Sequence, residues 1–244
     1  RVIEEFTRTS DPKLSEKASI IRYSLYEIET KIIACDIGRK RREILNQCKL
    51  YLITNNHQNA KEIVREGLIS GVKMVQFRSK EGNDKNRFYQ AQEIALLCKE
   101  FNALFIINDR IDLALAINAD GVHLGQEDIP IAIARNLLGS ERLIGKSTHS
   151  IKEIKKATED SCDYLGLGPI YQSKTKPEIN PIGEKYIKEA SMTAKIPFFA
   201  IGGINCSNAK DVNKKGASRV AVSSAIMNAN DPGLETKNLL TQLQ

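Results

Sequence analysis

Residues 104–124 read LFIINDRIDLALAINADGVHL, and this stretch contains the unit from which the fold can be predicted. Two short, mostly apolar runs, Leu104–Asn108 and Gly121–Leu124, are separated by a longer segment. Runs of this length and composition are typical of strands that are buried on both faces. Because parallel strands need a crossover connection, usually a helix, the stretch predicts a parallel strand–helix–strand unit.

The same alternation extends in both directions from this unit. The predicted strands are Leu50–Thr54, Met74–Arg78, Leu104–Asn108, Gly121–Leu124, Leu143–Ser147, Tyr164–Gly168, Pro197–Gly202 and Arg219–Ser223. Helical patterns, with an apolar residue at every third or fourth position, lie between them, for example at Asn59–Ser70, Asp84–Phe101, Ser150–Thr158 and Gly183–Ala194. Eight such units without a GxGxxG motif after the first strand favour a closed TIM (β/α)₈ barrel over an open doubly wound sheet.

The first 49 residues lie outside this alternation. Leu14–Ile33 has a helical pattern without a partner strand, and we expect that helix to end at Cys35–Gly38, with Gly38 as the breaker. The predicted organisation is therefore a helical extension over residues 1–49 and a barrel domain over residues 50–244. The extension is expected to cover one end of the barrel or to contact a second subunit, which would make the protein a homo-oligomer.

Composition limits the class of protein and its partners. With 244 residues, 41% of them apolar and 27% charged, the chain is expected to form one main globular core. No apolar stretch approaches the roughly 20 residues that cross a bilayer, so a membrane is not an expected partner. Five widely spaced cysteines argue against a disulfide framework or a zinc site and favour a reducing compartment. We therefore expect a cytoplasmic protein, or a plastid one if a targeting segment was removed.

The net charge of +6 suits either a nucleic acid or phosphorylated small molecules. The one basic cluster, Arg39–Arg42, has no interleaved aromatic residues, and it is expected to be a solvated helix face rather than a nucleic-acid contact. Small molecules are the expected partners.

Polar residues at the ends of the predicted strands indicate where the chemistry takes place, because barrel enzymes place their sites at the carboxyl ends of the strands. Gln76, Arg78 and Lys80 alternate along the second strand, so they share one side, and their donors suit a diphosphate. Asp109 and Asp128 follow the third and fourth strands and are candidate ligands for Mg²⁺. Asp128 alternatively fits a helix N-cap before Ile129-Pro130.

The remaining strand ends predict a second phosphate site. Gly202-Gly203 and Ser223-Ser224 follow the seventh and eighth strands, where barrel enzymes often bind phosphate. The loop after the sixth strand contains Ser173, Lys174, Thr175 and Lys176, hydroxyl and ammonium groups that suit a mobile lid over a ligand. His123 is expected to be a buried, hydrogen-bonded structural residue, and His149 is a candidate to orient Ser147.

Across residues 50–230 these motifs, in this order, resemble the thiamine phosphate synthase (thiamine-phosphate pyrophosphorylase) family. The stretches that carry the resemblance are Val75–Lys80, Ile106–Arg110, Asp112–Ala114, Asp120–Gln126, Asp128, Ile144–Gly145, Ser147–His149, Gly166, Gly168–Pro169, Lys174–Lys176 and Ala200–Ile204. Ser173 and Ser223 depart from the family pattern, which usually has Thr and an aliphatic residue there. Residues 1–49 resemble a helical extension of some members.

The resemblance implies a transferase that joins a hydroxymethylpyrimidine diphosphate to a thiazole phosphate and releases pyrophosphate. The residues it implies for the pyrimidine diphosphate are Gln76, Arg78, Lys80, Asn108, Ser147 and Lys176. Those implied for the thiazole phosphate are Ser173, Lys174, Thr175, Gly203, Ser223 and Ser224. Asp109 and Asp128 would bind Mg²⁺, and Arg78, Lys80, Lys176 and Ser147 would be catalytic. The alternatives are a thiazole tautomerase-like barrel and a non-catalytic binder of phosphate ligands.

Overall fold

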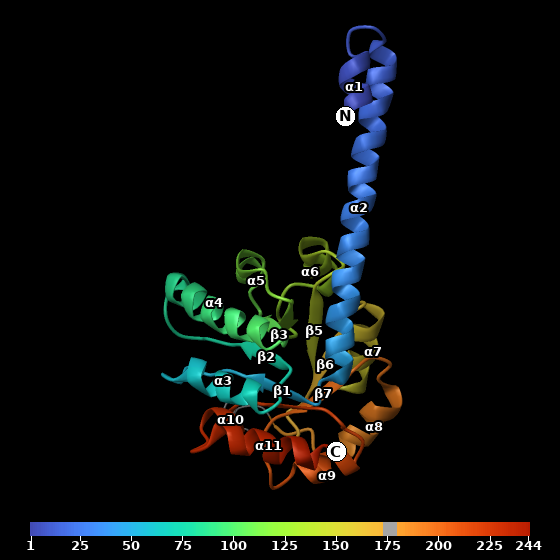
Figure 1. Ribbon diagram of the computed structural model, residues 1–244. Coiled ribbons are helices and arrows are strands. Elements are labelled where there is room, and N and C mark those ends of the chain that lie inside the picture. Colours follow the sequence, from blue (N-terminus) through green and yellow to red (C-terminus); the bar gives the residue numbers. More distant parts are fainter. Residues whose placement is uncertain (173–179) are drawn as a thin grey trace.

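The computed structural model, which describes residues 1–172 and 180–244, contains one closed barrel of eight parallel strands (Figure 1). The strands are β1 Leu50–Ile53, β2 Met74–Phe77, β3 Leu104–Asn108, β4 Gly121–Leu124, β5 Leu143–Thr148, β6 Tyr164–Leu167, β7 Phe198–Ile201 and β8 Val220–Val222. Each strand pairs with the next along the chain, and β8 closes the barrel by pairing with β1, where Val220 lies opposite Leu50. The predicted TIM barrel is confirmed.

Nine helices of the described residues follow or connect the strands and cover the outside of the barrel. They are α3 Ala60–Ile69, α4 Asp84–Glu100, α5 Ile111–Ile117, α6 Ile131–Leu138, α7 Ile151–Glu159, α8 Lys185–Thr193, α9 Ala209–Lys214, α10 Ser224–Met227 and α11 Pro232–Gln242. Outward residues of the strands, such as Val75 and Ile107, pack against these helices in one apolar cluster. Burial on both faces explains why the strands are apolar along their whole length.

A second apolar cluster fills the inside of the barrel. It joins Tyr51, Met74 and Leu143 of the strands to Leu45 and Cys48, which lie just before β1. The large ring of Tyr164 has room in this cluster because residue 145 on the neighbouring strand is glycine. A Cβ atom at Gly145 would lie 2.1 Å from Tyr164 Cζ. The glycine therefore lets a tyrosine side chain occupy the barrel interior.

The N-terminal residues form an arm that projects from the barrel (Figure 1). It consists of α1 Val2–Thr7, folded back against the long helix α2 Pro12–Gln47. The predicted end of this helix at Cys35–Gly38 is wrong, because α2 continues for nine residues beyond Gly38. Gly38 instead allows a close approach to the barrel, since a Cβ there would lie 3.1 Å from Glu141 Cα. None of the helices in the described ranges is both long and apolar enough to span a membrane.

The basic run Arg39–Arg42 attaches the arm to the barrel. Arg41 Nε donates to Asp120 at 2.7 Å, and Arg42 Nε donates to Asp163 at 2.8 Å. These two aspartates immediately precede β4 and β6, and each also accepts a hydrogen bond from a backbone N–H of a neighbouring strand. The prediction of a solvated helix face is therefore wrong for Arg41 and Arg42, whereas Arg39 and Lys40 are exposed.

Replacing Arg41 by alanine is expected to lower the free energy of unfolding by about 2 kcal/mol. The Arg41 side chain is only 12% exposed, and hydrogen bonds between charged groups contribute roughly 1.5–3 kcal/mol each. Urea denaturation measures this change. Arg39→Ala is the matched control, and it should change the free energy by less than about 0.5 kcal/mol because the Arg39 side chain is 60% exposed. Equal losses in the two variants would contradict a docking role for Arg41.

Candidate active site

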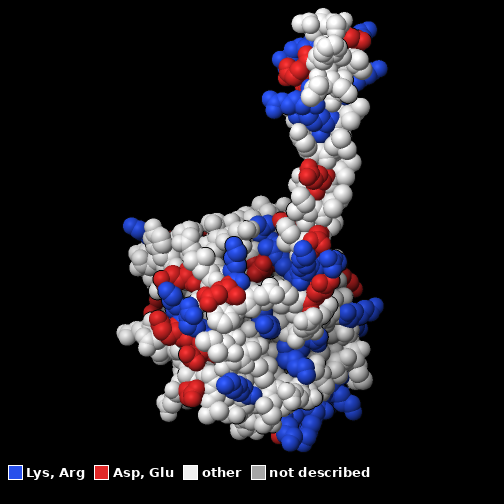
Figure 2. All heavy atoms as spheres, viewed as in Figure 1, with Lys and Arg blue, Asp and Glu red and all other residues white. Residues whose placement is uncertain are grey.

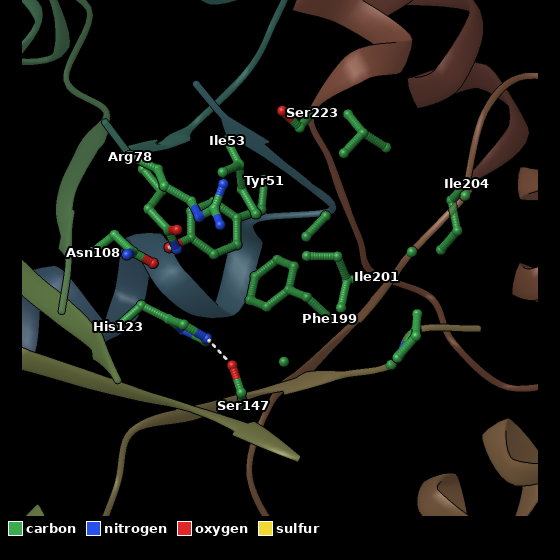
Figure 3. Close-up of a pocket in the computed structure, with 18 of the residues that line it drawn as sticks. Tyr51, Ile53, Arg78, Asn108, His123, Ser147, Phe199, Ile201, Ile204 and Ser223 are labelled. Atoms are coloured by element: carbon green, nitrogen blue, oxygen red, sulfur yellow. Dashed lines mark hydrogen bonds between the residues drawn. The ribbon is translucent and has the colours of Figure 1, made fainter. Parts of the chain in front are cut away.

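A pocket lies at the rim where the strands end and the βα loops begin (Figure 3). Its lining comes from all eight strands or the loops that follow them. The lining residues are Tyr51, Ile53, Gln76, Arg78, Asn108, His123, Ser147, His149, Gly166, Gly168, Pro169, Phe199, Ile201, Gly202, Gly203, Ile204, Ala221, Val222, Ser223 and Ser224. Figure 3 shows polar side chains along one side, from Arg78 to Ser147, and apolar ones at Phe199, Ile201 and Ile204. The pocket is therefore suited to a ligand with a charged and an apolar part.

Seven of the residues predicted for substrate binding meet in this pocket. They are Gln76, Arg78, Asn108, Ser147, Gly203, Ser223 and Ser224. Lys80 lies further along the exposed β2–α4 loop and is not among the lining residues. Ser173, Lys174, Thr175 and Lys176 lie outside the described residues, so their roles and the predicted lid remain predictions.

Arg78 follows β2 directly, and its backbone N–H donates to Thr54 Oγ1 at 2.9 Å, which fixes the start of the loop. Within residues 1–172 and 180–244 the guanidinium has no hydrogen-bond acceptor or salt-bridge partner, although its charge acts on Asp109. A guanidinium offers donors in a fork that matches phosphate oxygens. Arg78 is therefore available to an anionic ligand at the rim.

The two predicted metal ligands, Asp109 and Asp128, face each other beside the pocket. Burial, together with the contact to Asp128, raises the pKa of the Asp109 carboxyl to about 6. Asn108 Nδ2 donates to Asp109 Oδ2 at 2.5 Å, and the Gly125 N–H donates to Asp128 Oδ2 at 2.6 Å. The alternative N-cap role of Asp128 is wrong, because the N-cap of α6 is Pro130 and the Asp128 carboxylate instead closes the turn that begins at Gly125.

This acidic pair fits a magnesium ion. Two carboxylates in contact repel each other, and a divalent cation between them would remove that cost. Mg²⁺ usually takes one or two carboxylates and completes its shell with water and phosphate oxygens. No cluster of three or more His, Cys, Asp or Glu ligands was found in the part of the chain that the structure describes, and a two-carboxylate set matches the preference of Mg²⁺.

Lys146, which was not predicted from the sequence, supports the loop that carries Asp128. Its Nζ donates to the Gly125 carbonyl oxygen at 2.5 Å from a buried position on β5. Desolvation lowers the pKa of this ammonium group, while the charge of Asp128 acts in the opposite direction. The signal in the sequence was a lysine inside an otherwise apolar strand.

The two histidines near Ser147 have different roles from each other. His123 is buried and hydrogen-bonded, as predicted, and its Nε2 lies 3.0 Å from Ser147 Oγ (Figure 3). His149 was the candidate to orient Ser147, and that prediction is wrong. The His149 backbone N–H and its Nδ1 instead contact Glu153.

Tyr51, which lines the floor of the pocket, and Tyr164, which lies next to it in the barrel interior, have polar groups whose role was not predicted from the sequence. Tyr51 accepts a hydrogen bond from Gln76 Nε2 at 2.7 Å, and its hydroxyl lies 3.0 Å from that of Tyr164. Burial raises the pKa of both phenols above the ordinary value, so both remain protonated at neutral pH. The signal that could have found Tyr164 is Gly145, whose missing side chain makes room for the ring.

The fold and this pocket together define a (β/α)₈-barrel protein with a rim site suited to phosphorylated small molecules. A model of the family described as thiamine monophosphate synthase matches residues 50–226. The chain belongs to this family, and it is a transferase of thiamine biosynthesis. The predictions of family, fold and enzyme class are therefore confirmed.

Individual relatives agree with the family. The chain is 49% identical over 249 residues to a thiamine-phosphate synthase of Prochlorococcus marinus (strain MIT 9313), covering 100% of this chain and 70% of the relative. It is 48% identical over 248 residues, with the same two coverages, to a thiamine-phosphate synthase of Synechococcus sp. (strain CC9311). The solved thiamine phosphate pyrophosphorylase of Pyrococcus furiosus has a TM-score of 0.76 and 37% identity, covering 81% of this chain and 96% of that one.

Proposed function

We propose that this pocket condenses 4-amino-2-methyl-5-(diphosphooxymethyl)pyrimidine with 4-methyl-5-(2-phosphoethyl)thiazole to give thiamine phosphate and pyrophosphate. The observation that carries the residue assignment is the arrangement around Arg78. The Arg78 guanidinium, which has no ion-pair partner among residues 1–172 and 180–244, lies at one part of the rim with the amide of Asn108 and the facing carboxylates of Asp109 and Asp128. This combination suits a metal-bound diphosphate. A thiazole tautomerase or a simple phosphate binder has no diphosphate ligand and would not need it.

The two substrates would occupy different parts of the pocket. Arg78 is proposed to bind the diphosphate, with Lys80 and Lys176 as further cations, while Gln76, Asn108 and Ser147 contact the pyrimidine. Asp109 and Asp128 would hold Mg²⁺, which when bound would neutralise negative charge on the diphosphate oxygens. The thiazole phosphate is assigned to the Gly203 N–H, Ser223 and Ser224, together with Ser173, Lys174 and Thr175.

The proposed reaction needs no protein nucleophile. The C–O bond between the pyrimidine methylene and the diphosphate breaks, and the electron-rich aminopyrimidine stabilises the resulting cation. Arg78 stabilises the negative charge that develops on the leaving pyrophosphate. The thiazole nitrogen then attacks the methylene carbon, which it can reach because the phosphate anchor holds the thiazole in place. Phe199 and Ile201 form an apolar wall that restricts the access of water to the cation.

A direct assay tests this function. The protein is mixed with Mg²⁺ and both phosphorylated substrates, and thiamine phosphate and pyrophosphate are measured. Both products should appear in equal amounts, and only when both substrates are present. Isomerisation of the thiazole phosphate without coupling would instead identify a tautomerase, and binding without any product would identify a non-catalytic protein.

We also propose that two copies of the chain associate through the arm. Seven residues of α2 follow each other at alternating steps of four and three, which is the 3.5-residue period of a coiled coil. They are Leu14, Ala18, Ile21, Leu25, Ile28, Ile32 and Cys35. The five Leu and Ile side chains of this stripe are 45–64% exposed. In the described residues α1 lies along a flank of α2, where Arg22 pairs with Glu4, and leaves the stripe uncovered.

The 3.5-residue spacing of these apolar residues on α2 indicates what kind of partner would cover them. A 3.5-residue period matches the knobs-into-holes packing of another helix, and a second copy supplies an identical stripe for a symmetric pair. The middle of the arm is largely uncharged on the face seen in Figure 2, in contrast to the barrel.

The double substitution Leu25→Glu and Ile28→Glu is expected to convert a dimer into a monomer. In a symmetric pair this substitution would place four charges in a short apolar seam, and their burial would cost more free energy than the seam contributes. Light scattering coupled to size-exclusion chromatography should give twice the 27.2 kDa chain mass for the wild type and the single mass for the variant. Leu137→Glu on α6, where the side chain is 54% exposed, is the control and should leave the mass unchanged. A monomeric wild-type protein would refute the pairing.

A further inference from the structure

Five polar side chains form a continuous hydrogen-bonded chain across the inside of the barrel, at the floor of the pocket. Gln76 Nε2 lies 2.7 Å from the Tyr51 hydroxyl, which lies 3.0 Å from the Tyr164 hydroxyl. The Tyr164 hydroxyl lies 3.3 Å from His123 Nδ1, and His123 Nε2 lies 3.0 Å from Ser147 Oγ. The chain therefore runs from Gln76 on β2 to Ser147 on β5 through three intermediates on three other strands, of which Tyr51 and His123 also line the pocket.

The direction of hydrogen-bond donation along this chain follows from its first bond. Gln76 donates its amide N–H to Tyr51, so the Tyr51 hydroxyl hydrogen points to its other partner, Tyr164. The side chains of Tyr51 and Tyr164 are buried. A buried hydroxyl hydrogen without an acceptor would cost roughly 1–3 kcal/mol of folding free energy. Tyr164 then donates to His123 Nδ1. In a neutral His123 imidazole the ring proton is then on Nε2 and points to Ser147.

This direction determines what the two ends offer to a ligand. Ser147 Oγ accepts from His123, so its own hydroxyl hydrogen is available to the pocket. Gln76 uses one of its two amide N–H groups on Tyr51, and its carbonyl oxygen, on the other branch of the amide, remains to accept a hydrogen bond. The pocket thus has an acceptor on β2 and a donor on β5. An aminopyrimidine has both amine donors and ring-nitrogen acceptors, and a fixed pair of this kind restricts the placements of its ring.

We propose that Tyr51, Tyr164 and His123 are positioning residues that fix Gln76 as the acceptor and Ser147 as the donor for the pyrimidine ring. This inference rests on the proposed function for the identity of the ligand, but the direction of the chain is a property of the unliganded protein. The raised pKa values of the two tyrosines support it, because a phenolate could not donate its hydrogen to the next member. By orienting the ring, the three residues act on the position of the reacting methylene group.

The protonation of His123 provides a test that needs no substrate. Nitrogen NMR of the ¹⁵N-labelled protein at neutral pH should show a proton on Nε2 of His123 and none on Nδ1. In Tyr164→Phe this preference should be lost, because the donor to Nδ1 is removed while the ring is kept. A proton on Nδ1 in the wild type would overturn the inference, since it would mean that the Gln76 amide is turned around and that every bond of the chain runs the other way.

A double-mutant cycle tests whether the chain acts through Ser147. Tyr164→Phe is expected to lower kcat/KM for the pyrimidine diphosphate about tenfold in the wild-type background but less than twofold in Ser147→Ala. The KM for the thiazole phosphate should not change. Tyr51→Phe breaks the chain at another bond and should give the same pattern. Equal losses in both backgrounds would show a purely structural effect and overturn the inference.

Tyr186→Phe is the matched control for loss of a buried phenol oxygen. Among the described residues its hydroxyl has no hydrogen-bond partner, and it lies outside the chain. Its kcat/KM should stay within twofold of the wild type. If the wild-type protein formed no thiamine phosphate at all, the proposed function would fail, whereas the NMR result would still decide the direction of the chain.

Discussion

Replacing Arg78 by alanine should lower kcat about a thousandfold, with little change in the free energy of unfolding. The guanidinium is the one cation of the described pocket lining, and it would meet the charge that develops on the leaving pyrophosphate. Because it has no salt-bridge partner in the described residues and acts on Asp109 only as a weaker charge effect, its removal should change the free energy of unfolding little. Pyrophosphate release under saturating concentrations of both substrates measures the effect on kcat, and urea denaturation measures the effect on stability.

Two further variants make this result specific. Arg78→Lys keeps the charge but loses the fork of donors, so it should recover only part of the activity and remain about thirtyfold below the wild type. Arg110→Ala, at the end of the next strand, removes an arginine that already pairs with Asp84 and Asp112. Its kcat should remain within twofold of the wild type. If Arg78→Ala kept more than half of the activity, Arg78 would have no role in leaving-group stabilisation.

The barrel could be predicted because its signals are local in the sequence. β3 and β4 were predicted residue for residue, since short apolar runs between longer amphipathic segments leave few alternatives. The pocket followed from topology, because parallel strands bring their carboxyl ends to one rim. Gln76, Arg78, Asn108 and Ser147 therefore lie together although they are far apart in the sequence.

What could not be predicted depends on contacts between distant segments. Arg41 meets Asp120, 79 residues away, and Arg42 meets Asp163, 121 residues away, so the basic run gave no sign that it was paired. The same limit applied to Ser147. His149 is its neighbour in sequence, but the stagger of β4 against β5 places His123 Nε2 at the serine hydroxyl. The alternation of residues along a strand predicts which side of the strand a residue faces. Which side chain it contacts there depends on the register between strands in the assembled barrel.

Asp109→Asn should lower activity by at least about a hundredfold and at the same time stabilise the protein in the absence of divalent cations. The loss of activity follows from the proposed Mg²⁺ site. The gain in stability follows from the pKa, because burial and the neighbouring Asp128 raise the pKa of the Asp109 carboxyl to about 6 from its ordinary 3.8. Above pH 6 the folded protein therefore carries a charge that the unfolded chain accommodates better. With allowance for partial solvent exposure, relief of this charge is expected to contribute about 1 kcal/mol, or an increase of about 2–4 °C in Tm.

The stabilisation of Asp109→Asn should depend on pH, and this dependence tests independently whether the substitution stabilises or destabilises the protein. A raised carboxyl pKa means that the wild type loses stability as the pH rises through about 6, and that Asp109 is protonated in both states below about 4. The difference in Tm between Asp109→Asn and wild type should thus be near zero at pH 4 and reach its full value by pH 7. Asp112→Asn is the control. Arg110 lowers the pKa of Asp112 to about 2, so replacing the Asp112 carboxylate should not raise the Tm at any pH.

Magnesium should reverse the order of thermal stability of the wild type and Asp109→Asn. A cation that binds the folded state stabilises it in proportion to the logarithm of its concentration, so Mg²⁺ should raise the Tm of the wild type above that of Asp109→Asn. Calorimetric titration with Mg²⁺ alone, or with Mg²⁺ and pyrophosphate, should show heat of binding for the wild type and none for the variant. A variant that is less stable than the wild type without cations, or one that still binds Mg²⁺, would contradict the assignment of Asp109 as a metal ligand. The combined result would show that the acidic pair destabilises the metal-free protein and that the same negative charge is needed to bind Mg²⁺ for the reaction.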